Sequence, residues 1–278
     1  MIYAPIWKDI YYVSSAETLD YSIAVGDDVI YAGKAYIAPD ADILSINISK
    51  ICQDYLSNTL PDFRTLSAGT FVDTEAYKTF SLYSGETKVN DYNYLYCWDY
   101  ETDFDGTAVS LSHPINGHYG PDMKVFSTRW ESGSVITEMT EATSGFCGSA
   151  ALYYKNRSGG WDSFLIEGSI KRTDNYERYI YNKSFNNNTL DFEEAAYHNQ
   201  ITTKWVLHTG YLSDAESETL AFHLLSSNAV YFHNFQDNTI VPCNISDSSV
   251  TYKTFKNEGR KLVRYDITIS ESQKKQLL

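Results

Sequence analysis

One short segment of the sequence has the residue types of a nucleophilic site. TSGFCGSAALYY, residues 143–154, places Cys147 between Gly145 and Gly148. A thiol flanked by glycines is how a cysteine variant of the chymotrypsin arrangement presents its sulfur and the backbone amides of its oxyanion hole to a peptide bond. The chemical hypothesis is therefore a cysteine protease with Cys147 as nucleophile, which also requires a histidine base and usually a carboxylate.

The histidines before Cys147 argue against this chemistry. His113 and His118 precede Cys147 by only 34 and 29 residues, which leaves no room for the second barrel that such a fold puts between base and nucleophile. The apolar alternation SAALYY follows the cysteine directly. The sequence therefore favours a small buried thiol at the start of a strand, with the glycines allowing close approach of the backbone.

Acidic residues give two further partial patterns. ETDFDG, residues 101–106, matches the first six places of a calcium loop, but the twelfth place is Ser112 where a bidentate glutamate is needed. A polar turn is the favoured interpretation. Acidic pairs such as Glu193 and Glu194 would suit a glycosidase if they faced one another across a sugar. With 36 acidic residues in the chain, however, such neighbours arise by chance.

The remaining composition excludes several classes of function. The formal net charge of -14, without a long basic run, argues against a groove for nucleic acid. The four cysteines are too widely spaced for a zinc site, and we find no phosphate loop or dinucleotide fingerprint. No apolar stretch reaches the roughly 20 residues that span a bilayer, and the start lacks a secretory signal. We expect a protein that is made in the cytoplasm, with no cofactor, no metal and no membrane segment.

The elements that position these residues are expected to be strands. Of the 278 residues, 24 are Tyr, 13 Phe and 5 Trp, and aromatic residues suit pleated surfaces. Runs such as LDYSIAV, DVIYA and KAYIA, with the turn-like GDD, AGK and PDAD between them, predict a meander over residues 10–48. SKICQDYLSNTL then predicts a short helix with Ile51, Tyr55 and Leu56 on its apolar face.

The last 80 residues carry the clearest local signals. Ser213 and Glu216 stand three apart as a capping box, and Leu220, Ala221, Leu224 and Leu225 follow as the apolar face of a helix. The strands NAVYFHN, TIVPCNIS, SVTYKTF and KLVRYDITIS come after it. We predict an antiparallel meander with this one capped helix packed on it.

The predicted fold class is mainly β with a smaller α+β module at the C-terminus, and the body is expected to consist of antiparallel sheets in a β-sandwich-like arrangement. Residues 1–60 are interpreted as an N-terminal β meander with a short helix. Residues 61–196 form a β-rich middle region, interpreted as an insertion with an extended hairpin, and residues 197–278 form the α+β module. Thr102–Pro121 is expected to be a long loop with at most one short strand, and NRSGGW at 156–161 is expected to be a turn. The segment after Gly168 is expected to form one side of the hairpin and to pair with ITTKWVLHTG at 201–210.

Aromatic residues supply the candidate binding surface. Tyr and Trp are enriched in protein interfaces, and their rings also stack on sugar faces. The candidates for an interface or for glycan contact are Trp98, Trp161, Tyr176, Tyr179 and Tyr181.

Several stretches resemble virion structural proteins of crAss-like tailed bacteriophages. The resemblance is carried by WVLHTGYLSDAESETLAFHLLSSNAVYFHNFQDNTIVPCNISDSSVTYKTFKNEGRKLVRYDITIS, by LYYKNRSGGWDSFLIEG, and more loosely by APIWKDIYYV and GKAYIAPDADILSINISKICQDYL. It covers about half of the chain and lies in packing and turn positions: Asn156, Gly159, Gly160, Trp161, Trp205, Gly210, Leu212, Ser213 and Tyr252. No catalytic residue is carried over, and Cys147 has no counterpart in the pattern.

The resemblance implies a non-enzymatic tail ring, collar or hub component of the virion, made in the host cytoplasm. It implies contacts with copies of the same chain, with adjacent tail or connector proteins and, as a further class, with fibre proteins. A glycan-binding adhesin or fibre adaptor is the alternative hypothesis. The Cys147 protease is the third.

Overall fold

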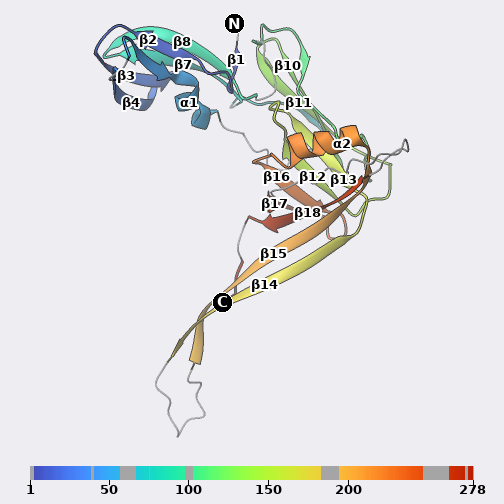
Figure 1. The fold of residues 1–278 in the computed structure, drawn as a ribbon. Coiled ribbons are helices and arrows are strands. Elements are labelled where there is room, and N and C mark those ends of the chain that lie inside the picture. Colours follow the sequence, from blue (N-terminus) through green and yellow to red (C-terminus); the bar gives the residue numbers. More distant parts are fainter. Residues whose placement is uncertain are drawn as a thin grey trace, which may run out of the picture. The chain divides into compact units, whose positions relative to one another are not determined.

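The computed structural model describes residues 3–38, 41–56, 67–74, 76–97, 103–182, 194–246, 263–272 and 275–277. The protein is mainly β, with several antiparallel sheets and one capped helix near the C-terminus (Figure 1). The predicted fold class is therefore confirmed. The cause is the one the composition indicates, because β-branched and aromatic side chains fill pleated surfaces better than helical ones.

The chain folds as two compact units. The first comprises residues 1–113, 125–140 and 155–162, and the second comprises residues 114–124, 141–154 and 163–278. Each unit is assembled from segments that are separated in the sequence. The division into three successive domains with boundaries near residues 60 and 196 assumes chain order, and it stays a prediction.

The first unit contains three sheets. A five-stranded sheet has the order β1 (Ala4–Pro5), β8 (Thr87–Leu95), β7 (Tyr77–Ser84), β3 (Thr18–Val25) and β4 (Asp28–Tyr36). Its neighbours are antiparallel except β1 and β8. A four-stranded sheet has the order β6 (Gly69–Val72), β11 (Ser134–Glu141), β10 (Lys124–Glu131) and β9 (Val109–Ser110). The third sheet pairs β2 (Tyr11–Ser14) with β5 (Leu44–Asn47).

The predicted turn at AGK, residues 32–34, is wrong. DVIYAGKAY forms the single strand β4, whose residues pair with β3 across Gly33. A Cβ atom at Gly33 would lie 2.9 Å from the ring of Tyr31, so the glycine leaves room for an aromatic side chain that lies along its own strand. Glycine inside a strand thus marks a close contact here, and not a reversal of the chain.

The predicted helix after residue 48 exists, and Ile51 and Leu56 pack on the core as predicted, whereas Tyr55 does not. Helix α1 (Ile48–Cys52) continues into the 3₁₀ turn η1 (Gln53–Tyr55). Ile48, Cys52 and Leu56, which are spaced four apart, lie in the core of the first unit. Tyr55 is exposed and its hydroxyl donates to the carbonyl oxygen of Ile30 at 2.6 Å. The four-residue period therefore starts at Ile48, because the helix begins directly at the end of β5.

The second unit is built on an eight-stranded sheet. Its order is β13 (Trp161–Ile166), β12 (Ala150–Lys155), β16 (Val230–Asn234), β17 (Thr239–Ile245), β18 (Val263–Glu271), β15 (Glu194–Leu212) and β14 (Ile170–Asn182), with β19 (Lys275–Leu277) also paired to β15. Antiparallel pairing of β16, β17 and β18 confirms the predicted C-terminal meander for these strands. The SVTYKTF strand lies outside the described residues.

The capped helix of the second unit forms as predicted. In α2 (Asp214–Thr219) the Ser213 hydroxyl accepts from the backbone N–H of Glu216, and the Glu216 carboxylate accepts from the N–H of Ser213 at 2.6 Å. The helix continues as the π-helical turn η2 (Leu220–Leu224). Leu220 and Leu224 are fully buried in a core that includes Phe232 and Ile267 of the sheet. The cap therefore fixes where the helix that covers this sheet begins.

Strands β14 and β15 form a long antiparallel hairpin, which confirms the pairing predicted for this region. Residues 170–182 pair with residues 194–207, and the register shifts between Tyr179 and Ile180. Strand β18 pairs with β15 only from Lys204 to Leu212, and β19 pairs with Asn199–Ile201. Figure 1 shows the outer part of the hairpin, in yellow and orange, extending well past the rest of the sheet. We call residues 175–182 and 194–201 the arm.

Candidate functional site

The three predicted interface tyrosines all lie on the arm and all are exposed. The exposed fractions are 62% for Tyr176, 44% for Tyr179 and 50% for Tyr181, and Ile180 between them is 54% exposed. Such side chains normally bury most of their area in a folded protein. An aromatic cluster of this kind on a narrow ribbon is typical of a surface that a partner covers.

The alternation of the strand distributes the cluster over both faces of the arm. Tyr176 and Ile180 are separated by four residues and share one face, whereas Tyr179 and Tyr181 share the other. Charged residues Glu177 and Arg178 lie between them and are also exposed. A partner that covers the arm would therefore contact it from two sides.

The outer edge of β14 has no neighbouring strand within the described residues. In the sheet order β14 is terminal, with β15 as its one partner. The edge is 13 residues long, and an open edge of a sheet presents backbone N–H and C=O groups for pairing with another chain. The arm thus combines an open edge with exposed tyrosine side chains on both faces.

Trp161 does not belong to this surface, and its prediction as an interface or glycan contact is corrected. The side chain is completely buried. Its ring packs against Phe126 with centroids 6.3 Å apart, and the Lys155 ammonium lies 5.7 Å from the ring centroid. A buried indole has no free face for a sugar or for another subunit. Trp98, the other predicted tryptophan, lies outside the described residues.

Trp161 is buried because the turn before it is pinned by glycines. A Cβ atom at Gly159, whose φ is +85°, would lie 2.0 Å from the carbonyl oxygen of Tyr96, and one at Gly160 would lie 2.2 Å from that of Leu111. No other residue fits such close backbone approaches. The turn predicted at NRSGGW is confirmed. Its backbone packs closely against other segments of the first unit. The Asn156 side chain also spans it, accepting from the Gly160 N–H at 2.9 Å.

Cys147 is exposed, which corrects the expectation of a buried thiol. The other three cysteines are buried. Cys147 lies three residues before β12, in a loop whose Gly145 would place a Cβ atom only 1.8 Å from the carbonyl oxygen of Tyr119. The glycines do permit close backbone approach, as predicted. The loop packs through its backbone, so the sulfur itself is left outside the core.

A histidine and a carboxylate stand beside this loop. The His118 ring stacks on Phe146, with centroids 4.2 Å apart and planes 29° apart, and its Nδ1 contacts the Glu167 carboxylate. Phe146 also donates its backbone N–H to Tyr119 at 2.9 Å. The sequence separation that argued against a base does not prevent His118 from lying near Cys147. No local sequence signal marks this pair, because His118 and Glu167 are 49 residues apart in the chain.

The arrangement nevertheless lacks the central bond of a nucleophilic site. Catalysis by a cysteine requires a hydrogen bond between the nucleophile and its base, with the base oriented by a third group. The contact between Glu167 and His118 could orient a histidine base. Among the residues that the structure describes, none forms a hydrogen bond with the Cys147 sulfur. The Nε2 atom of His113, the other upstream histidine, forms a hydrogen bond with the Ser158 hydroxyl at 2.8 Å. These contacts hold loops in place.

A buried carboxylate lies in the first unit. Asp162 accepts from the backbone N–H of His113 at 2.8 Å and from the side-chain amide of Asn156 at 2.6 Å. Burial raises the pKa of Asp162 to about 7, against the lowering effect of those hydrogen bonds. Asn156 also donates to the carbonyl oxygen of Leu111 at 2.6 Å. The network ties the long loop at Thr102–Pro121 to the β12–β13 turn, and β9 is the short strand expected in that loop.

The calcium pattern does not gather ligands. Asp103 forms an ion pair with Lys8 at 2.8 Å, and the Asp105 carboxylate accepts from the backbone N–H of Thr107 at 2.9 Å. Gly106 has φ of +101°, as a turn requires. Within the described part of the chain, no three His, Cys, Asp or Glu residues group in a way that would hold a metal ion. Glu101 and Glu193 lie outside the described residues.

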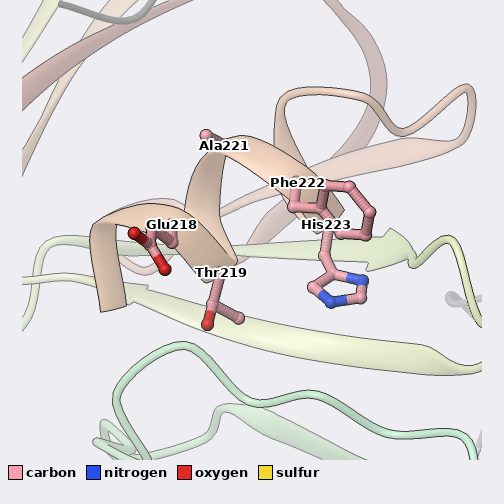
Figure 2. A pocket seen from close by; sticks show the side chains of 5 residues that line it. All are labelled: Glu218, Thr219, Ala221, Phe222 and His223. Carbon is pink, nitrogen blue, oxygen red and sulfur yellow. The ribbon is translucent and has the colours of Figure 1, made fainter. Parts of the chain in front are cut away.

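A hollow of about 530 Å³ lies beside the C-terminal helix. Figure 2 shows its lining, in which Thr219 and His223 point to the same side of the helix and Ala221 points away from them. Glu218 and Phe222 complete the lining. All five residues come from one helix, so the hollow presents no second element that would hold a substrate against them.

Comparisons with known proteins give no relative. A scan against family models, a search of curated proteins and a search of solved structures all found no match. Over the residues that the structure covers, no helix combines the length and the apolar character that crossing a bilayer requires.

Proposed function

We propose that this protein is a non-enzymatic structural component of a tailed-phage virion. In this proposal it assembles as an oligomeric ring or collar in the tail and joins neighbouring tail proteins, after synthesis in the host cytoplasm. The observation that carries the proposal is the arm, which presents Tyr176, Tyr179 and Tyr181 to solvent on a ribbon with an open edge. The virion assignment is supported by the resemblance of the quoted sequence stretches.

The arm is suited to assembly because of its length and its composition. At about 3.3 Å per residue, the 13 residues of β14 extend over roughly 40 Å. A ring needs heterologous contacts, in which one face of a subunit meets a different face of the next. A projecting ribbon supplies one such face without requiring the sheet behind it to change. Tyrosine suits this role because a rigid amphipathic ring buries a large area at a low cost in entropy.

The proposed partners extend this assembly. Copies of this chain are the first partner, since a ring repeats one contact. Adjacent tail or connector proteins, and fibre proteins as a further class, would contact the surfaces that the ring leaves open. The chain's net charge of -14 keeps free subunits soluble and apart until a specific contact forms.

The experiment is incorporation into particles. A phage lacking this gene is complemented with the wild-type chain or with a triple variant, Tyr176→Ser, Tyr179→Ser and Tyr181→Ser, and purified particles are analysed by mass spectrometry. We expect the wild-type chain in stoichiometric amounts in the tail and at least a tenfold loss of the triple variant, since interface tyrosines often contribute about 2 kcal/mol each.

The matched control removes exposed tyrosines elsewhere. Tyr36→Ser with Tyr211→Ser changes side chains that are 65% and 69% exposed and that do not belong to the arm. This control should be incorporated normally. Absence of the wild-type chain from particles would contradict the virion assignment, and normal incorporation of the triple variant would contradict the role of the arm.

A further inference from the structure

A groove of about 1000 Å³ lies at the base of the hairpin, within the second unit. One wall is the start of β14 with β15, and the other is the end of β16 with the turn that follows it. The loop after Cys147 closes one end through Gly148 and Ser149. Its size is that of a small-molecule site, in which a few placed polar groups set the specificity. It is separate from the arm and from the helix hollow.

The register of the hairpin places a cation over an aromatic ring in the first wall. Arg172 of β14 stands directly opposite Trp205 of β15, and its guanidinium lies 5.4 Å from the indole centroid. Phe232 packs against the indole with centroids 5.0 Å apart. The indole is therefore enclosed by two neighbours and supports the guanidinium, so it is Arg172 that meets a ligand here.

The hydrogen bonds of Arg172 leave its terminal groups for a ligand. Its Nε is 3.1 Å from the Asp174 carboxylate, which fixes the plane of the guanidinium. The two terminal nitrogens form no hydrogen bond with any described residue. The side chain is 51% exposed. A guanidinium that is held flat and offers two parallel N–H groups is the preferred partner of a carboxylate.

The second wall offers a different chemistry. Asn234 accepts through its side-chain oxygen from the backbone N–H of Gln236 at 3.1 Å, which directs its amide group as a donor. One carboxylate oxygen of Asp237 accepts from Thr239 at 2.6 Å, and the other is left to accept from a ligand hydroxyl. Gln236 is exposed and adds a second amide. These groups suit a ligand rich in hydroxyl groups, and Asp237 would repel one that is acidic throughout.

We propose that this groove binds a carboxylated sugar, such as a uronic or sialic acid within a glycan, with the carboxylate on Arg172 and the hydroxyl groups on Asn234, Gln236 and Asp237. Such a ligand has one carboxylate and several hydroxyl groups. The groove offers one cation in its first wall, and amides and a carboxylate in its second wall. An acidic peptide matches the cation alone. The site gives the protein a glycan-binding activity that does not depend on Trp98 or Trp161 and is independent of its assembly.

The test is binding of the purified full chain to a glycan array that contains uronic-acid and sialic-acid glycans, their methyl esters, neutral glycans and a hexaglutamate peptide. We expect saturable binding to at least one carboxylated glycan and none to its methyl ester. Arg172→Gln should weaken that binding by about tenfold to a hundredfold, because a hydrogen bond to a charged group is lost. Gln236→Ala, at an exposed position, should weaken it by a smaller factor.

Arg264→Gln is the matched control, because Arg264 lies on β18 of the same sheet, is exposed, does not line the groove and lies outside the arm. It should bind as the wild type does. Binding of no carboxylated glycan, tighter binding of the peptide than of any glycan, or equal binding by the Arg172→Gln and wild-type chains would each overturn the proposal. The triple tyrosine variant of the arm should keep the binding, so failure of the assembly proposal and failure of this one are distinguishable.

Discussion

Strands β13 and β14 are consecutive in the chain and form opposite edges of one sheet, yet they differ in almost every physical respect. All six residues of β13 are buried. In β14 every residue from Asn175 to Tyr181 is exposed. Both strands contain aromatic residues, Trp161 and Phe164 in β13 and three tyrosines in β14. Aromatic content therefore identifies a strand without saying whether the protein's own core or a partner will cover it.

The charges between the aromatic residues make the difference. Strand β13 contains one acidic residue, Asp162, which is satisfied by His113 and Asn156. Strand β14 contains Lys171 and Arg172 near its start, and Glu177 and Arg178 lie between Tyr176 and Tyr179. Long charged side chains are costly to bury in a core but tolerable in an interface that is only partly dry. The difference fits the proposal that a partner, and not the protein's own core, covers the outer part of β14.

The two strands are expected to differ most when one aromatic residue in each is truncated to alanine. Phe164→Ala in β13 should lower the free energy of unfolding of the second unit by about 3–5 kcal/mol, because a fully buried ring is lost and a cavity remains. Tyr181→Ala in the arm should change it by no more than about 0.5 kcal/mol. Urea denaturation monitored by fluorescence measures both. Equal losses would show that the arm packs on its own chain.

The second prediction concerns the last residue of β12. Lys155 and Asp73 form an ion pair at 2.9 Å in which both side chains are 2% exposed. Burial lowers the pKa of Lys155, and the Asp73 carboxylate opposes that shift. Asp73→Ala should lower the free energy of unfolding by about 3–5 kcal/mol, because it leaves a buried charge without a partner. Removing both charges, with Asp73→Leu and Lys155→Met, should restore most of the loss.

The control is a second ion pair, which lies on the surface of the protein. Lys88 and Asp91 also pair, at 2.7 Å, but their side chains are about half exposed. Asp91→Ala should lower the free energy of unfolding by at most about 1 kcal/mol. If thermal unfolding shows similar changes for Asp73→Ala and Asp91→Ala, burial is not what gives the Lys155 pair its effect.

The third prediction is a pH dependence that arises in β13. The pKa of Asp162 rises from 3.8 to about 7 in the folded protein. The stabilising contribution of its protonated form is therefore complete below about pH 4 and is lost as the pH rises to about 7, because the unfolded chain releases this proton first. At about 1.4 kcal/mol per pKa unit, the loss approaches about 4 kcal/mol.

Asp162→Asn isolates this effect, since asparagine stays neutral. The melting temperature of the variant relative to the wild type should increase steadily between pH 4 and pH 7. A constant difference across that range would mean that Asp162 is ionised throughout, and that the hydrogen bonds from His113 and Asn156 outweigh its burial.

The smallest expected effect concerns the helix that covers the buried part of the sheet. Ser213→Ala removes the side-chain acceptor of the capping box and should lower the free energy of unfolding by about 1 kcal/mol. Ser213→Asp should preserve it, because aspartate also accepts from the N–H groups at the start of a helix. Circular dichroism during denaturation measures both variants, and a similar loss in Ser213→Asp would contradict a capping role.

Local chemistry explains which features could be predicted from the sequence. The capping box at Ser213 and the turn at NRSGGW depend on residues close together in the chain, whereas the pairing of β14 with β15 joins two strand-like segments. Each of the three appears in the structure. Gly33 was misassigned because a glycine in a strand and a glycine in a turn have the same local sequence. Only the position of the Tyr31 ring separates them.

The surface residues were harder to predict because burial is set by distant segments. Trp161 is buried by Phe126 and by the close backbone approach at Gly159, neither of which its own strand reveals. Cys147 is exposed because its loop packs through backbone atoms against Tyr119. The groove at Arg172 combines a strand, its partner and a turn more than 60 residues away, so no local motif marks it.

The native mass of the purified protein shows whether the arm joins copies of this chain into a closed oligomer. Native mass spectrometry of the wild-type chain, alone and with extracts of particles that lack it, should show a closed oligomer with one fixed copy number, whereas the triple tyrosine variant of the arm should be monomeric under the same conditions. A wild-type chain that stays monomeric in both settings, or a triple variant with the same oligomeric mass as the wild type, would contradict the account.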